Sequence, residues 1–331
     1  MNYEEFKDVV KQEFMSYLPE KYRHLKLDIR PVEKVNVVKD GMNFLDMNQK
    51  TWATPTFYVQ DMYDSYLDLG DYQEVFEAVA ATVSKALRRP PVEANLDLKD
   101  AKENIVFQLI NTEQNKEMLS SLPHREIHDL SIIYRWVVQK DEKGIKSGIV
   151  KKELMEKLGL DEEQIFKLAV ENYKRLLVPT VRTMDEVMIE TMVARGYTED
   201  YAEFFVEQHS TKEKMWVISN ETKINGAGSM LYDDVLQTVA KELNSNLYVI
   251  PSSVHEIIAI PVGFVQPHEL ANLVNEVNMN DVSLEERLSN QVYHYDKHAH
   301  KLSMATNTPL KRLDGLKDEP QPIYDTIVRI R

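Results

Sequence analysis

Cysteine is absent from the whole chain of 331 residues. A chain without thiols cannot use thiol catalysis, form disulfides, or bind zinc or iron–sulfur clusters through thiolates. It also lacks an apolar run of the ~20 residues that a membrane-spanning helix needs. Residues 1–18 have neither the basic start nor the continuous apolar stretch of a signal peptide. We therefore expect a soluble, cytoplasmic protein that does not associate with a membrane.

Basic residues are few relative to acidic ones. The chain has 40 Lys and Arg residues and 54 Asp and Glu residues, so its formal net charge is −14 and its pI is near 5.2. A single folded unit of this mass exposes roughly 14,000 Å², or about 1,000 Å² per net negative charge. This charge argues against nucleic-acid binding through a general basic face, and it is too dilute to indicate a nucleic-acid mimic.

Hydrophobic residues make up 43% of the chain and charged residues 28%, as in a folded globular protein. The patterning predicts an α+β fold. Residues 1–210 are expected to form a mixed region of helices and a β-hairpin, whose strands are placed at 130–139 and 145–150. Residues 211–304 follow the order β-α-β-β-α-β, which is typical of a split βαβ unit. Residues 305–331 are predicted to be a loose tail, with one last strand at 323–331.

A stretch without Lys or Arg, residues 51–84, is the most distinctive electrostatic feature. Its candidate binding residues are the aspartates Asp61, Asp64, Asp68 and Asp71, with Tyr63 and Tyr66 between them. Spacings of three, four and three place the aspartates on one helical face, where like charges repel by about 0.2–0.5 kcal/mol per pair. A basic protein partner would relieve this repulsion on binding, although a solvated acidic face is the commoner explanation.

Two turns between predicted strands invite a functional interpretation. Ser252, Ser253, His255 and Glu256 are weak candidates for a serine nucleophile with its base, but triads are usually assembled from distant residues and the string G-x-S-x-G is missing. Asn225, Gly226 and Gly228 are candidates for binding an anion through backbone N–H groups, although the lysine of a P-loop is absent. In both cases a purely structural turn is the favoured interpretation.

Histidines and carboxylates alternate in two places, which makes them weak candidates for metal ligands. On an extended strand, alternating side chains face the same side, and imidazole and carboxylate ligands suit zinc, manganese or iron. The candidates are His124, Glu126, His128, His294, Asp296, His298 and His300. Against a metal site, Asp296 and Lys297 are expected to begin a turn that breaks the alternation. A solvated, histidine-rich edge is the favoured interpretation, and no cofactor is expected.

Four ordered sets of strings resemble a family of proteins. They are Asn111-Thr112-Glu113 with Pro123-His124-Arg125 and Asp129-Leu130; Asn225-Gly226-Ala227 with Met230-Leu231-Tyr232; Tyr248-Val249-Ile250-Pro251-Ser252-Ser253-Val254-His255-Glu256; and Val274-Asn275-Glu276-Val277-Asn278 with Val292-Tyr293-His294-Tyr295-Asp296. The resemblance is to an uncharacterised domain-of-unknown-function family of anaerobic gut bacteria and their mobile elements and phages. The C-terminal part also resembles a second uncharacterised bacterial family that shares the Pro-Ser-Ser-x-His-Glu string. The resemblance implies a cytoplasmic protein of a kind often carried by mobile DNA, and it supplies no catalytic residues.

These observations favour an interaction or accessory protein over an enzyme. The hypothesis is that it serves a mobile element or phage by binding a host protein through the acidic, tyrosine-containing stretch. Two alternatives remain open. One is a metal-dependent hydrolase or nuclease that uses the histidine and carboxylate groups or the Ser-His-Glu turn. The other is a module that binds a small anionic ligand at residues 225–228.

Overall fold

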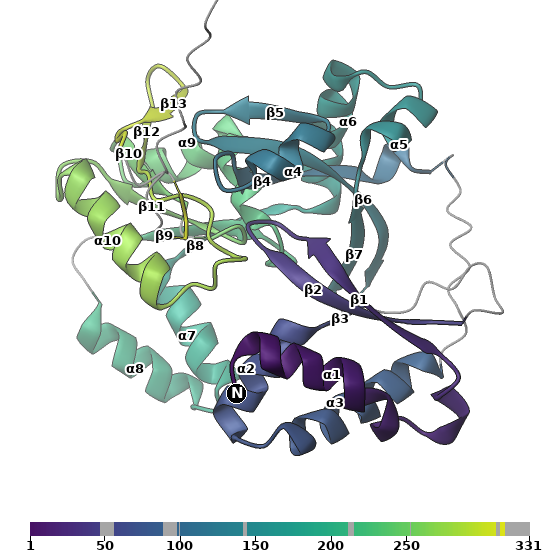
Figure 1. Cartoon of the computed structure of the whole chain (residues 1–331). Coiled ribbons are helices and arrows are strands. Elements are labelled where there is room, and N and C mark those ends of the chain that lie inside the picture. Colours follow the sequence, from purple (N-terminus) through teal and green to yellow (C-terminus); the bar gives the residue numbers. More distant parts are fainter. Residues whose placement is uncertain are drawn as a thin grey trace, which may run out of the picture. The chain divides into compact units, whose positions relative to one another are not determined.

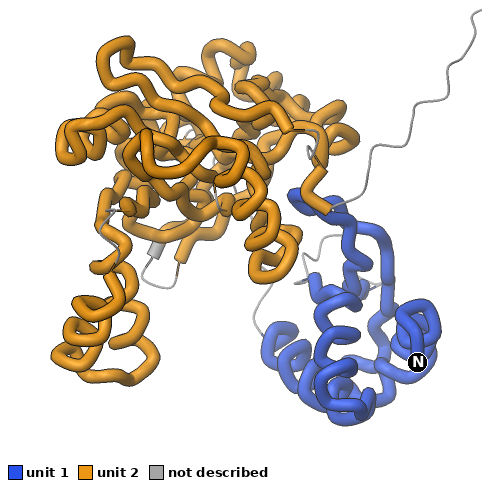
Figure 2. The backbone as a smooth tube through the Cα atoms, turned by 90° about the vertical axis from the view of Figure 1, so that its left-hand side faces the viewer, with its two compact units in different colours: residues 1–96 blue, residues 97–331 orange. Residues whose placement is uncertain are grey.

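The computed structural model describes residues 1–46, 56–88, 98, 100–141, 144–210, 215–251, 253–308 and 312–314. Its contacts divide the chain into two compact units, Met1–Leu96 and Asp97–Arg331 (Figure 1 and Figure 2). Both units combine helices with antiparallel sheets, which confirms the predicted α+β class. Within the described ranges, no helix has the length and apolar character needed to cross a bilayer.

Unit 1 consists of a small sheet and the helices packed on it. The sheet is antiparallel in the order β1-β2-β3, and its core is formed by aromatic rings, among which Phe6, Phe14, Phe44 and Phe76 are fully buried. The elements are α1 (Tyr3–Tyr17), η1 (Glu20–Tyr22), β1 (Lys26–Glu33), β2 (Val38–Leu45), β3 (Phe57–Tyr58), α2 (Val59–Leu69) and α3 (Tyr72–Leu87).

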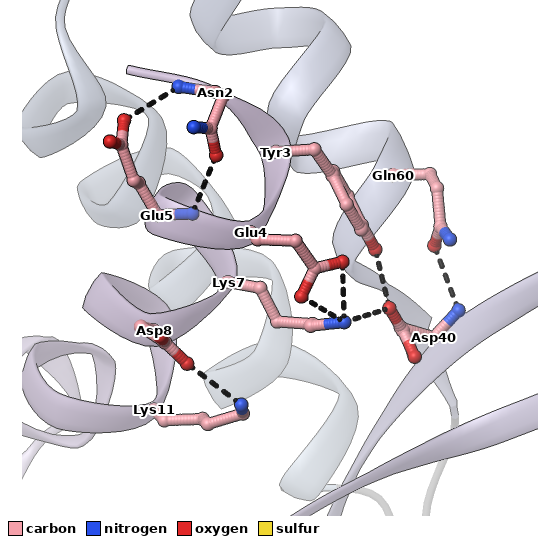
Figure 3. Close-up of polar contacts among 9 residues, drawn as sticks. All are labelled: Asn2, Tyr3, Glu4, Glu5, Lys7, Asp8, Lys11, Asp40 and Gln60. Carbon is pink, nitrogen blue, oxygen red and sulfur yellow. Dashed lines mark hydrogen bonds and ion pairs between the residues drawn. The ribbon is translucent and has the colours of Figure 1, made fainter.

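Helix α1 begins at a cap that its sequence specifies. The Asn2 side chain accepts a hydrogen bond from the Glu5 N–H, and the Glu5 carboxylate accepts one from the Asn2 N–H (Figure 3). Phe6, Val10 and Phe14 follow at a spacing of four and form the buried face of the helix. The cap therefore fixes where α1 starts, and the apolar stripe fixes which face packs on the sheet.

A polar network joins α1 to strand β2 (Figure 3). Asp40 accepts hydrogen bonds from the Tyr3 hydroxyl at 2.7 Å and the Lys7 ammonium at 3.1 Å. Burial acts to raise the pKa of Asp40, but these two donors outweigh it and hold the pKa below its ordinary value. Burial and the bond to Asp40 also raise the pKa of the Tyr3 hydroxyl far above its usual range. Tyr3 is therefore a neutral donor that anchors the helix.

Unit 2 contains a four-stranded antiparallel sheet centred on a long strand, β6 (Leu130–Asp141). Strand β4 (Ile105–Asn111) pairs along one edge of β6. On the other edge, β5 (His124–Ile127) pairs with the first part of β6, and β7 (Gly144–Ile149) pairs with the last part. The β6–β7 pair confirms the hairpin predicted at 130–139 and 145–150.

A second, six-stranded antiparallel sheet has the order β13-β12-β10-β11-β9-β8. Within it, β9, α9, β10, β11, α10 and β12 follow one another in the predicted order β-α-β-β-α-β. Strand β11 lies between β9 and β10, and β10 lies between β11 and β12, so each helix connects two parallel strands across an intervening one. The remaining elements of unit 2 are η2 (Lys102–Asn104), α4 (Lys116–Ser121), α5 (Lys152–Lys157), α6 (Glu162–Leu176), β8 (Pro179–Thr183), α7 (Met184–Ala194), α8 (Glu199–His209), β9 (Trp216–Asn220), η3 (Gly226–Leu231), α9 (Asp233–Glu242), β10 (Leu247–Ile250), β11 (Ile257–Pro261), α10 (Pro267–Asn280), β12 (Tyr293–Asp296) and β13 (Lys301–Met304).

The alternation of side chains along β10 explains how this sheet is covered on both faces. Leu247 and Val249 belong to the main core of unit 2, which also contains the buried side chains of α6 and α9. Tyr248 and Ile250 point the other way, into a smaller apolar cluster with α10. Helices α9 and α10 therefore cover opposite faces of the six-stranded sheet.

The compact units divide the chain at a different place from the boundary near residue 210 that we expected. Strand β8 precedes that boundary, yet it pairs with β9 in the six-stranded sheet, and the main core contains residues from both sides of it. The tail was predicted to be loose, but one of its residues, Leu313, is fully buried. The Leu313 N–H donates to the Gln114 side chain, and its carbonyl accepts from Arg287. The strand expected at 323–331 lies outside the described residues.

Candidate functional site

Two turns singled out from the sequence meet at one junction in unit 2. The turn that leads into η3 contacts the β10–β11 loop, where the Asn225 N–H donates to His255 Nδ1 at 3.3 Å. The Ala227 N–H donates to the Val254 carbonyl at 3.2 Å. From the other side, the Tyr173 hydroxyl donates to the Asn225 carbonyl, and burial raises the pKa of this hydroxyl to about 12. The junction therefore ties three segments of the core together.

At this junction two glycines occupy positions where a side chain would clash with its neighbours. Gly226 and Gly228 are both buried, and a Cβ on Gly228 would lie 2.8 Å from the Phe107 ring. Residues 226–230 are buried as a group, so their backbone faces protein. This geometry favours a structural turn over the anion-binding loop that Asn225, Gly226 and Gly228 allowed.

The Ser-His-Glu string is used within its own loop. The Ser253 hydroxyl accepts from the His255 N–H at 3.0 Å, and the Ser253 N–H donates to the Glu256 carbonyl. The His255 ring lies between the Asn225 N–H and the Glu286 carboxylate, which is 3.8 Å from its Nε2. Ser252 lies outside the described residues. These contacts are those of a turn that joins two strands, and they do not aim the Ser253 hydroxyl at the imidazole.

The alternating histidines and carboxylates do not converge. His124 and Glu126 lie on β5, and His128 lies in the turn that follows it. In the second set, β12 ends at Asp296, whose carboxylate accepts from the Ala299 and His298 N–H groups; these bonds lower the pKa of Asp296. His298 and His300 therefore leave the strand face occupied by His294, as the expected turn implied. In the described part of the chain, no three His, Asp or Glu residues are grouped closely enough to hold a metal ion.

The acidic stretch of unit 1 forms a surface different from the one predicted. Gly70, with φ of +78°, ends α2, so Asp71 is the N-cap of α3 and does not continue the face that carries Asp64 and Asp68. Asp61 pairs with Lys39 at 2.8 Å. Asp64 and Asp68 are exposed.

The interleaved tyrosines serve mainly to pack unit 1. The rings of Tyr63 and Tyr66 lie 5.4 Å from that of Phe6, and both tyrosines are only partly exposed. Their hydroxyls contact Met1. This half of the predicted binding surface is therefore an extension of the core.

A surface that the sequence did not predict lies on the α7–α8 hairpin, which projects from the rest of unit 2 (Figure 1 and Figure 2). Helix α7 has no buried residue, although Met184, Met188 and Met192 have the spacing of four that is typical of a core-facing stripe. Its neighbour α8 buries only Ala202 and Val206. Large side chains of the hairpin that face solvent are Met188, Val193, Tyr197, Tyr201 and Phe204.

Aromatic rings follow one another from the α7–α8 turn along α8. Tyr197 stacks on Tyr201 at 5.5 Å, Tyr201 on Phe205 at 6.4 Å, and Phe205 on the His209 ring at 4.2 Å. Phe204, which is 61% exposed, lies beside this aromatic row. The regular spacing of four is visible in the sequence and could have identified the row. The sequence alone does not show that the row is exposed to solvent.

The hairpin is strongly acidic as well as aromatic. Residues 184–209 contain seven carboxylates and a single arginine, Arg195. Asp200, Glu203 and Glu207 on α8 are all exposed and lie within four residues of Phe204. An aromatic surface with carboxylates around it is suited to a ligand that is both cationic and flat.

A comparison with protein families finds a match over most of the chain. The model of DUF5688, a family of unknown function, matches residues 3–297 of the chain. Comparisons with curated proteins and with solved structures gave no match.

Proposed function

Because the chain belongs to DUF5688, a family of unknown function, no established activity comes with it, and we propose that it is an interaction module whose α7–α8 hairpin binds an arginine-containing segment of another protein. The observation that carries this proposal is the aromatic row Tyr197, Tyr201, Phe205 and His209, in which all but the half-buried Phe205 are exposed. The exposed Phe204 lies beside it, on a hairpin whose helix α7 has no buried residue. Exposed apolar patches of this kind mark interaction sites in soluble proteins.

Charge selects the occupant of this surface. The net charge of −14 disfavours both a nucleic-acid backbone and a second copy of the chain. Arginine fits better than lysine because its planar guanidinium stacks on aromatic rings and pairs with carboxylates in a fixed geometry. From Tyr201 to His209 the row spans about 12 Å at 1.5 Å per residue. An extended segment of about four residues covers that length.

The test uses the full chain and two fluorescein-labelled peptides, one with arginine and one with lysine at alternating positions. Fluorescence anisotropy at about 150 mM salt is expected to show tighter binding of the arginine peptide. The double variant Tyr201→Ala/Phe204→Ala is expected to weaken binding by about tenfold or more, as for residues at the centre of an interface. Phe264→Ala is the matched control, since Phe264 is 59% exposed but lies outside the hairpin.

Two outcomes would refute the proposal. One is equal affinity for the arginine and lysine peptides combined with no effect of the double variant. The other is an equal loss of binding in Phe264→Ala, which would indicate nonspecific contact with exposed rings.

The biological setting is part of the same proposal. The resemblance described above supports a cytoplasmic accessory protein, carried by a mobile element or phage, that acts on a host protein. Affinity capture from a host lysate with the natural chain and with Tyr201→Ala/Phe204→Ala tests it. A basic host protein retained only by the natural chain would support the setting. Identical captures from both would argue against the hairpin as the contact surface.

A further inference from the structure

Unit 2 contains a pocket of about 180 Å³, away from the α7–α8 hairpin. It forms where the end of β4, the β5–β6 turn and the segments that flank β12 and β13 come together, and Glu113, His128, Asp129, Gln291 and Asn307 are among the residues that line it. Pockets for drug-sized ligands measure about 300–1,000 Å³, so this one suits a smaller group.

One wall of the pocket is rigid and already satisfied. Gln291 is only 1% exposed. Its side-chain oxygen accepts from the Thr308 N–H and the Thr306 hydroxyl, and its amide nitrogen donates to Thr308. The Gln291 side chain therefore already has its hydrogen-bond partners within the protein. A ligand in the pocket would be bound by the other side chains.

Asp129 is held in place by two hydroxyl donors. Its carboxylate accepts from the Ser289 hydroxyl at 2.6 Å and from the Tyr293 hydroxyl, and both donors are fully buried. Burial and the neighbouring Asp129 charge raise the pKa of Tyr293 well above its ordinary value, so its hydroxyl remains a donor. A carboxylate offers about four lone-pair positions. With two of them used by these hydroxyls, Asp129 retains acceptor capacity.

The charge of the lining is negative. Glu113 adds a second carboxylate, and its contact with Lys116 is long, at 3.8 Å, with the Lys116 side chain 74% exposed. None of the described residues that line the pocket is a lysine or an arginine. His128 has a φ of +59°, and its ring lies edge-on to the Tyr293 ring at 5.7 Å.

We infer that this pocket binds a small cationic group with N–H donors, an ammonium or guanidinium, between the carboxylates of Asp129 and Glu113. A bound cation would supply the positive charge that the lining lacks and form charge-assisted hydrogen bonds with the two carboxylates. An anionic ligand would be repelled by the same pair. This site is separate from the α7–α8 surface, and the inference does not depend on the proposed function.

The test is ligand-observed saturation-transfer NMR on the full chain, with agmatine as the cationic probe and succinate as the anionic one. Agmatine is expected to bind saturably with a Kd at or below roughly 10 mM, and succinate is expected not to bind. Glu113→Gln and Asp129→Asn are each expected to weaken agmatine binding by about tenfold, the effect of losing one charged hydrogen-bond partner.

Matched variants separate this site from general attraction to an acidic protein. Glu117→Gln removes an exposed charge on α4 outside the pocket lining and is expected to leave binding unchanged. Agmatine carries a guanidinium and can also bind the α7–α8 surface, so the assay is repeated in Tyr201→Ala/Phe204→Ala, where the binding that remains is expected to be the part that Glu113→Gln removes. If Asp129→Asn disturbs folding through Ser289 and Tyr293, Glu113→Gln still decides. No saturable agmatine binding, binding unaffected by Glu113→Gln, or an equal loss in Glu117→Gln would each overturn the inference.

Discussion

Gly226 lies directly against the backbone carbonyl of His255: a Cβ built on Gly226 would be 2.3 Å from that oxygen and 2.3 Å from the Ser219 hydroxyl. The Ser219 hydroxyl itself donates to the His255 carbonyl at 2.7 Å. The turn before η3 and the β10–β11 loop are thus joined with no space between them. Two of the most recognisable strings of the sequence meet here for reasons of packing.

Gly226→Ala is therefore expected to destabilise unit 2. Forcing a methyl group against a backbone carbonyl displaces one of the two segments, at a cost of about 1–3 kcal/mol or more. The midpoint of urea unfolding, followed by circular dichroism, measures this change. Gly148→Ala is the control, because a Cβ there would have no atom within 4 Å. A Gly226→Ala chain as stable as the Gly148→Ala chain would contradict the packing argument.

Leu313 provides a second test of stability. Its side chain is fully buried, although its place in a polar, proline-containing tail predicted a loose segment. Leu313→Ala is expected to lower the free energy of unfolding by about 2–5 kcal/mol, the usual cost of removing a buried leucine. Leu273→Ala on α10 is the comparison: Leu273 is 55% exposed, and the expected change is within about 0.5 kcal/mol. Equal effects would mean that the tail does not dock through Leu313.

The sequence predicted the regular parts of this fold well, for physical reasons. The β6–β7 hairpin and the β-α-β-β-α-β order depend on local periodicity and turn residues, which a single sequence displays. Strand β5 was missed because its four residues, His124–Ile127, are mostly polar and form a strand only through pairing with β6. Strand β8 was missed because it begins with Pro179 and is only half-buried along its length.

The candidate surfaces were harder to predict because exposure is a property of the tertiary structure. Met184, Met188 and Met192 have the spacing of a buried stripe, yet α7 buries none of its residues. Likewise, Tyr63 and Tyr66 follow the pattern of an exposed acidic face but pack against Phe6. Periodicity identifies which residues share a face, and only the arrangement of the elements decides whether that face is covered.

The ion pairs of Glu190, on α7, predict that the stability of the folded chain depends on pH. Its carboxylate contacts the Lys223 ammonium at 2.5 Å and the Arg182 guanidinium, and these donors lower its pKa to about 2. A carboxyl group with a lowered pKa stabilises the folded chain above its ordinary pKa of 4.5. That stabilisation is lost as the pH falls from about 4.5 towards 2. Because the Glu190 side chain is 46% exposed, the contribution is at most about 1 kcal/mol.

The measurement compares urea midpoints of the natural chain and Glu190→Gln between pH 2 and pH 7. The natural chain is expected to be the more stable at pH 7, with the difference shrinking through the window below pH 4.5. Glu242→Gln, at the exposed end of α9, corrects for the general loss of one negative charge. A difference that stays constant down to pH 2 would exclude Glu190 as its source.

Added metal ions are expected not to stabilise the protein. The candidate ligands are dispersed: the His300 imidazole contacts Asp233 at 2.8 Å, and Asp296 caps its own turn. A ligand that binds only the folded state raises the apparent melting temperature. Thermal unfolding with and without equimolar zinc, manganese or iron measures this directly. A clear stabilisation that Asp296→Asn or His300→Ala abolishes would restore the metal-dependent hydrolase hypothesis.

Charge reversal on the acidic face of α2 and on the α7–α8 hairpin is expected to affect peptide binding differently. Of the aspartates predicted as a binding surface in unit 1, only Asp64 and Asp68 are suited to this test, because Asp61 pairs with Lys39 and reversing Asp71 would also remove the cap of α3. If the hairpin is the docking surface, the charges changed in Asp64→Lys/Asp68→Lys do not contact the peptide and affect it only through electrostatic interactions that salt screens. We then expect less than about a twofold change in affinity for the arginine peptide. Asp200→Lys/Glu207→Lys on α8 is expected to weaken the same peptide by about tenfold or more, since like charges at an interface are strongly unfavourable. If instead the α2 variant loses binding and the α8 variant retains it, the interaction surface is the acidic face of α2.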